Sequence, residues 1–185
     1  MEKIETALPG VLVVRPKVLR DNRGFFFESY HREKFAELGI KDSFVQDNHS
    51  RSRRGTVRGL HYQLRHPQAK LCRVVLGEVL DVAVDIRRGS PTFGKSVAVL
   101  LSAENQQQIY VPGGFAHGFA VLSESAEFLY KCSDFYYSED EHGVLWNDPA
   151  LKIDWGVSQP LLSDKDSKFQ PLARIPHELL PTYSG

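Results

Sequence analysis

The sequence has little cysteine and no excess of charge of either sign. Cys72 and Cys132 are its only two cysteines; each lies in an apolar run typical of a strand, and they form no Cys-x-x-Cys pair. This pattern favours small buried side chains over a disulfide or a reactive thiol. Lysine and arginine number 23, as do aspartate and glutamate, so no global field attracts nucleic acid or an anionic membrane.

Long apolar runs are also missing. No stretch approaches the roughly 18 apolar residues needed to span a bilayer, and the N-terminal segment MEKIETALPG carries acids and a proline before any apolar run. We therefore expect a cytoplasmic protein without a membrane partner. The basic cluster at residues 51–54 is typical of a solvated loop when the net charge is zero. A small ligand is the expected partner, rather than a nucleic acid.

Short strand-like segments recur along the chain. Its 185 residues allow one well-buried core and are too few for two, so we expect a single domain over residues 1–185. About ten segments show strand patterning, and turn signals such as Gly89-Ser90-Pro91 separate them. The pattern predicts an all-β antiparallel sandwich or barrel. The exceptions are a short surface helix over residues 31–38 and short, proline-interrupted helical turns after Tyr137.

Two segments with histidine, RGLHYQ at residues 58–63 and VPGGFAHGF at residues 111–119, lie on or at the ends of predicted strands. Strand alternation places His61 on the face of Gly59 and Arg58 on the opposite face. A ligand that touches both His61 and Arg58 therefore requires the strand to bend near Gly59. Three further histidines are interpreted as surface residues: His49, His66 and His142.

The spacings Gly59-x-His61 and Pro112-x-Gly-x-x-His117 resemble the two half-motifs of the cupin superfamily, which implies a jelly-roll, double-stranded β-barrel. A metal-binding cupin has a second histidine two residues after the first, and an acid soon afterwards. That place holds Gln63 here, followed by leucine and arginine. An ion would then lack the three protein ligands of a catalytic site, so we expect no metal. The absence of the second histidine and of the acid also argues against a metal-dependent cupin oxygenase.

A longer series of motifs resembles the dTDP-4-dehydrorhamnose 3,5-epimerase family, in the same order from about Leu8 to Asp166. The resemblance implies an isomerase that converts dTDP-4-dehydro-6-deoxy-D-glucose into dTDP-4-dehydro-L-rhamnose, a step towards surface polysaccharide. It implies no cofactor, and a homodimer in which N-terminal strands cross to the partner. The motifs are RGFFFESY, FVQDNHS, RGLHYQ, GEVLDVAVDIR, SPTFG, LSAENQ, VPGGFAHGFAVLSE, AEFLYKCSDFYY, LWNDP and LLSDKD.

This reaction defines the residues to look for. A C4 ketone acidifies the hydrogens on C3 and C5, so the enzyme needs a base, a proton donor and a partner for the enolate oxygen. The resemblance implies that His61 is the base, Asp166 its carboxylate partner, and Tyr130 the proton donor on the opposite face of the sugar. A tyrosine packed in the barrel with its hydroxyl bonded is the alternative for Tyr130.

Lys70 and two aspartates are candidates from strand alternation. Lys70 begins a strand whose inward row is otherwise apolar, which suits stabilisation of an enolate; a solvated strand end is the alternative. Asp81 and Asp85 share one face of the segment VLDVAVDI. Either could line a polar pocket and orient His117, and a solvent-facing strand explains them equally well.

The resemblance also implies a set of ligand-binding residues, with Tyr136 stacked on thymine. The others are Arg23, Glu28, Gln46, Asp47, Asn48, Arg58, His117, Glu141 and Lys165. Lys70, the candidate from strand alternation, is also expected to contact the substrate. Two alternatives to the double epimerase remain: a relative that inverts one carbon or moves the ketone to C3, and a nucleotide-sugar binding barrel without catalysis.

Overall fold

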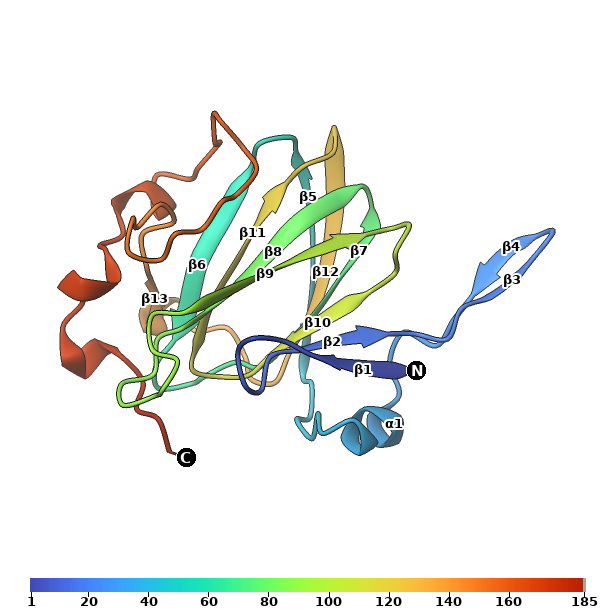
Figure 1. The fold of residues 1–185 in the computed structure, drawn as a ribbon, viewed down its shortest axis with the longest axis horizontal. Coiled ribbons are helices and arrows are strands. Elements are labelled where there is room, and N and C mark those ends of the chain that lie inside the picture. Colours follow the sequence, from blue (N-terminus) through green and yellow to red (C-terminus); the bar gives the residue numbers. More distant parts are fainter. Residues whose placement is uncertain (185) are drawn as a thin grey trace.

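The structure is a computed structural model that describes residues 1–184. Two antiparallel sheets that face each other form the body of the protein (Figure 1). The first sheet has the order β1 (Glu2–Glu5), β2 (Leu12–Arg15), β10 (Gln108–Val111), β7 (Lys70–Leu76), β12 (Ser125–Cys132) and β5 (Gln46–Arg53). The second has the order β13 (Glu141–Gly143), β6 (Val57–Gln63), β11 (Phe115–Val121), β8 (Glu78–Asp85) and β9 (Ser96–Ser102). The predicted all-β jelly roll is confirmed.

Helical elements are short and peripheral, as predicted. The helix α1 (Arg32–Glu37) buries Phe35 against the six-stranded sheet and is followed by Gly39, whose φ is +98°. The 3₁₀ turns η2 (Asp166–Lys168), η3 (Leu172–Arg174) and η4 (His177–Leu179) follow the barrel strands, and η1 (Ser138–Asp140) precedes β13. Among the described residues, no helix has the length and apolar character to cross a membrane.

Both faces of the five-stranded sheet are covered. Val79 and Ala83 of β8 pack between the two sheets, whereas Val82 and Val84 pack outward against C-terminal residues such as Trp155. The C-terminal segment therefore covers what would otherwise be a solvent-facing side of β8. Asp81 and Asp85 lie on the inner face with Val79 and Ala83 and are fully buried, so the solvent-facing interpretation of these acids is wrong.

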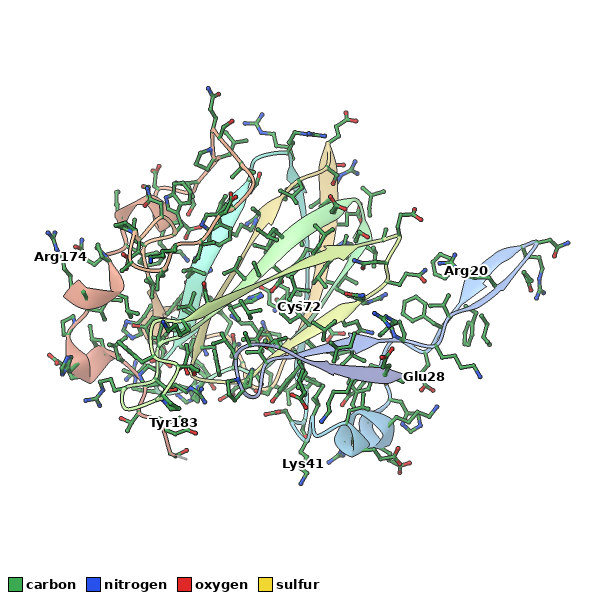
Figure 2. All side chains as sticks on the ribbon, in the orientation of Figure 1. Arg20, Glu28, Lys41, Cys72, Arg174 and Tyr183 are labelled. Atoms are coloured by element: carbon green, nitrogen blue, oxygen red, sulfur yellow. The ribbon has the colours of Figure 1, made fainter. Side chains whose placement is uncertain are left out.

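One element stands away from the barrel. The hairpin of β3 (Leu19–Asp21) and β4 (Gly24–Phe26) projects from the body (Figure 1) and leaves Phe25 57% and Phe26 70% exposed. Figure 2 shows Cys72 in the middle of the barrel and Glu28 near the base of this projection. Both cysteines are free and buried, as predicted.

Candidate active site

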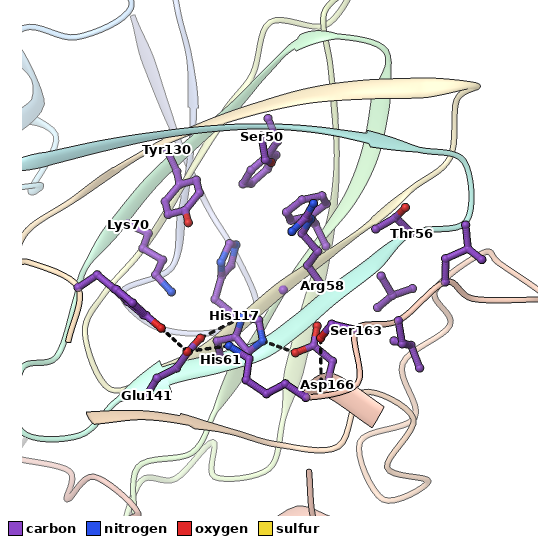
Figure 3. A pocket seen from close by; sticks show the side chains of 18 residues that line it. Ser50, Thr56, Arg58, His61, Lys70, His117, Tyr130, Glu141, Ser163 and Asp166 are labelled. Carbon is purple, nitrogen blue, oxygen red and sulfur yellow. Dashed lines mark hydrogen bonds and ion pairs between the residues drawn. The ribbon is translucent and has the colours of Figure 1, made fainter. Parts of the chain in front are cut away.

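A cavity of about 600 Å³ lies between the two sheets (Figure 3). Its wall contains side chains from both sheets and from the segment around η2, so residues far apart in the sequence meet there. The cavity brings together nine of the residues predicted from the sequence: Arg58, His61, Lys70, His117, Tyr130, Tyr136, Glu141, Lys165 and Asp166.

Strand β6 has the bend that the sequence requires for Arg58 and His61 to share a ligand. The register between β6 and β11 shifts between the pairs of His117 and Phe119. Gly59 has a φ of +121°, and a Cβ at this position would lie 2.6 Å from Cα of Gly118. Only glycine allows this backbone and this close approach. The shift lets Arg58 and His61 both line the cavity.

His61 and Asp166 form a pair at one wall of the cavity. Nε2 of His61 lies 2.6 Å from Oδ1 of Asp166, whose side chain is 3% exposed. Burial alone would raise the pKa of Asp166, but the hydrogen bond and charge of His61 hold it below its usual value. An ionised carboxylate only accepts hydrogen bonds, so Nε2 carries the proton. In the neutral ring, Nδ1 then has the free lone pair and is the basic atom.

Tyr130 and Lys70 belong to the opposite sheet. They come from β12 and β7, and Figure 3 shows them across the cavity from His61 and Asp166. Burial raises the pKa of Tyr130 to about 12. The phenol is therefore protonated near neutral pH, and its proton becomes useful only to a strong base such as an enolate.

Three polar side chains, those of Glu141, Tyr136 and Lys165, form a cluster at the mouth of the cavity. Oε2 of Glu141 accepts hydrogen bonds from the Tyr136 hydroxyl and from Nζ of Lys165, each at 2.7 Å. These two bonds and the charge of His61 outweigh burial and lower the pKa of Glu141. Tyr136 is 51% exposed, so its ring is open to a planar ligand.

A second pair of a histidine and an aspartate, His117 and Asp81, lies deeper in the barrel. Nε2 of His117 lies 2.9 Å from Oδ1 and 3.0 Å from Oδ2 of Asp81, and 3.9 Å from Sγ of Cys72. Among the residues described, these three form a cluster that could ligate a metal ion. Strand alternation made Asp81 a candidate partner of His117 but gave no sign of Cys72, because it does not show which strands face each other across the barrel.

The remaining predicted residues do not line the main cavity. Gln46 and Asn48 line an adjoining cavity of about 260 Å³, together with Lys70 and Tyr130. Asp47 alternates to the other face of β5, where it pairs with Lys131 at 2.9 Å.

Two more predicted residues lie near the projecting hairpin. Arg23 pairs with Asp21 at 2.6 Å, and Glu28 pairs with Lys34 at 2.8 Å. The catalytic and ligand-binding roles of all the predicted site residues, including Arg23, Glu28 and Asp47, stay predictions. Sequence reasoning also missed Ser50, which lines the cavity and whose buried Oγ has no hydrogen-bond partner among the described residues.

Comparison with known proteins places this geometry in a family. The family described as dTDP-4-dehydrorhamnose 3,5-epimerase matches residues 5–174. The chain belongs to this family. It is 58% identical to a dTDP-4-dehydrorhamnose 3,5-epimerase of Pseudomonas aeruginosa over 175 residues, which are 94% of this chain and 97% of that protein. The enzyme class predicted from the motifs, an epimerase of dTDP-rhamnose biosynthesis, is confirmed.

Solved structures agree with this family. The epimerase of Legionella pneumophila in complex with dTDP-4-keto-L-rhamnose is 51% identical, with a TM-score of 0.97, over 100% of this chain and 99% of that one. ChmJ, a 3′-monoepimerase of Streptomyces bikiniensis in complex with dTDP-quinovose, is 37% identical, with a TM-score of 0.89, over 96% and 92% of the two chains.

Proposed function

We propose that the protein epimerises dTDP-4-dehydro-6-deoxy-D-glucose at C3 and C5 with His61 as the base, without a metal ion. The observation that carries this proposal is the placement of an imidazole, oriented by a buried carboxylate, opposite a phenol in one cavity. The complex of the Legionella relative with dTDP-4-keto-L-rhamnose supports the choice of substrate. Residues 1–185 would act as one domain. The cytoplasmic location stays a prediction.

In the proposed reaction, Nδ1 of His61 takes the hydrogen of C3 or C5 as a proton. The electron pair of that C–H bond forms the C=C bond of an enolate, and the carbonyl electrons move to the C4 oxygen. The ammonium group of Lys70 stabilises this oxygen. The carboxylate of Asp166 stabilises the imidazolium that forms.

Inversion requires the proton to return from the other side of the sugar ring. Tyr130 belongs to the sheet opposite His61, and its phenol donates to the enolate carbon while the C4 carbonyl re-forms. The resulting tyrosinate regains a proton from solvent, and the imidazolium loses one to solvent. Both groups are then restored, and a hydrogen from water replaces the original one at each inverted carbon.

Residues around this centre would hold the rest of the substrate. Asp81 orients His117 towards the sugar, and Arg58 contributes positive charge to the same cavity. Lys165 and Tyr136 lie at its mouth, where a cation suits a diphosphate and an exposed ring suits stacking on thymine. Gln46 and Asn48 line the adjoining cavity.

We also propose that the active form is a homodimer. The exposed aromatic residues Phe25 and Phe26 on the projecting hairpin support this, because apolar side chains on an extended arm favour a protein partner. In this arrangement Arg23 and Glu28 approach the cavity of the second subunit. Sedimentation equilibrium tests the assembly, and a monomer at assay concentrations would contradict it.

Proton NMR in heavy water tests the reaction. After exhaustive chelation, the purified protein is expected to place deuterium at both C3 and C5 of the dTDP-linked ketosugar. Deuterium at C3 alone would favour a monoepimerase, for which the similarity to ChmJ is the supporting observation. Loss of turnover on chelation would contradict the metal-independent mechanism.

A further inference from the structure

The buried cluster of Cys72, Asp81 and His117 has a property that epimerisation does not use. The three residues come from β7, β8 and β11, and one ligand atom from each lies within 4.8 Å of the other two. We propose that this cluster is an inhibitory binding site for a thiophilic divalent cation, such as Zn²⁺ or Cd²⁺.

The donor set suits such an ion. Thiolate, imidazole nitrogen and carboxylate oxygen are the ligands that zinc takes, at about 2.0–2.3 Å. Tetrahedral placement at these lengths separates the ligand atoms by about 3.4–3.6 Å. The thiol and carboxylate lie 3.9 Å and 2.9 Å from Nε2 of His117. The Cys72 sulfur lies within 4.8 Å of an Asp81 oxygen, so the proposed site requires the side chains to shift towards tetrahedral spacing as the ion binds.

Charge also balances at the cluster. A Cys72 thiolate and the Asp81 carboxylate together carry two negative charges, which neutralise a divalent cation in a buried place. Cys72 and Asp81 are fully buried, and His117 is 6% exposed. An apolar wall surrounds the cluster, in which the Phe128 ring stacks at 6.3 Å from the His117 ring. An uncompensated charge would be costly in this environment. The zero net charge of the ion, the thiolate and the carboxylate together therefore favours binding.

Entry and exchange follow from the position of His117, which lines the main cavity. This cavity is the expected route of an ion to the cluster, and a water molecule from the cavity is expected to fill the fourth position. Without an ion, burial and then the charge of Asp81 raise the pKa of Cys72 well above its usual value, so the thiol is protonated. Binding releases this proton to solvent and moves the His117 proton from Nε2 to Nδ1.

The expected consequence is a loss of turnover. An ion on Nε2 replaces the hydrogen bond to Asp81 that orients His117. Nδ1 then carries the ring proton and can no longer accept a hydrogen bond from the sugar. The inhibition rests on the proposed role of His117 in binding substrate, whereas the binding of the ion does not. Cys72 contributes only to the ion site in this account, which makes it the residue to vary.

The experiment is a titration of the full-length protein with CdCl₂ in the absence of substrate, followed by the epimerase assay. Wild-type protein is expected to bind one Cd²⁺ per chain at this cluster and to show the ultraviolet charge-transfer band of a cadmium–thiolate bond. Saturation should lower kcat/KM by about tenfold or more, the factor that corresponds to loss of one good hydrogen bond. Excess chelator should restore the activity.

Cys72→Val and Cys72→Ala should retain the activity of ion-free protein and lose both the band and the inhibition. Cys132→Ala is the matched control, because Cys132 is the other buried thiol, and it should keep both responses. Absence of the thiolate band in wild-type protein would overturn the proposal without any variant. A band that persists in both Cys72 variants, or a band without inhibition, would also contradict it.

Discussion

Replacement of Asp166 by asparagine tests the pairing that makes His61 a base. The substitution keeps the shape of the side chain and removes its charge from a position that is 2% exposed. Because Nε2 of His61 lies 2.6 Å from the carboxylate, the imidazolium formed during reaction loses its nearest counter-charge. Asparagine can also accept or donate at this position, so it no longer requires the proton to be on Nε2.

The size of the effect follows from Coulomb's law. Two unit charges about 4 Å apart at an effective dielectric constant of about 20 attract by about 4 kcal/mol, which corresponds to about 1,000-fold in rate. The His61 side chain is 25% exposed, and water screens part of this attraction. We therefore expect Asp166→Asn to lower kcat by about 10²- to 10³-fold.

The assay is steady-state turnover of the dTDP-linked ketosugar, with thermal unfolding measured in parallel. Asp164→Asn is the matched control, because Asp164 is an exposed acid two residues away on the same segment, and it should leave kcat nearly unchanged. A folded Asp166→Asn variant with kcat within about threefold of wild type, far from the Coulomb expectation, would refute the reasoning.

Three further substitutions have distinct expected outcomes. Tyr130→Phe should lower turnover by about 10²- to 10⁴-fold, and NMR in heavy water should show exchange by His61 without inversion; inversion at the wild-type rate would contradict this role. Lys70→Met should lower kcat by about 10²- to 10³-fold with little change in KM, and a change in KM alone would indicate simple binding. Asp85→Ala should lower the free energy of unfolding in urea by about 3–5 kcal/mol, because it leaves the partly buried Arg87 without its carboxylate and the buried Ser90 hydroxyl without its acceptor; a loss below about 1 kcal/mol would contradict the importance of this network. Burial alone would raise the pKa of Asp85, but hydrogen bonds from Arg87, Ser90 and Thr92 lower it to about 2. The ionised carboxylate therefore stabilises the fold above about pH 4, and this stabilisation is lost as the pH falls towards 2.

Local pattern was enough to predict most of the fold. Alternation of apolar and polar residues identified the strands, and the helical spacing around Phe35 predicted α1 to within about one residue at each end. The same alternation showed that His61 and Arg58 need a bend at Gly59, which the register shift between β6 and β11 provides. These features depend on neighbours in sequence, so the sequence alone contains their signal.

Features that depend on how distant strands face each other were not predictable in this way. Asp81 and Asp85 lie on the same face of β8 as Val79 and Ala83, so their burial depends on the six-stranded sheet that packs against this face. The approach of Cys72 to His117 depends on how β7 and β11 face each other across the barrel. A two-residue period shows which side a residue faces, but not what lies opposite.

The central claim is that one imidazole removes the hydrogens from both carbons beside the ketone. Its most direct test is proton NMR of chelator-treated His61→Asn protein with the dTDP-linked ketosugar in heavy water, beside wild type. The account predicts deuterium at C3 and C5 with wild type and at neither position with the variant. Exchange at either carbon at the wild-type rate in the folded His61→Asn variant would contradict it.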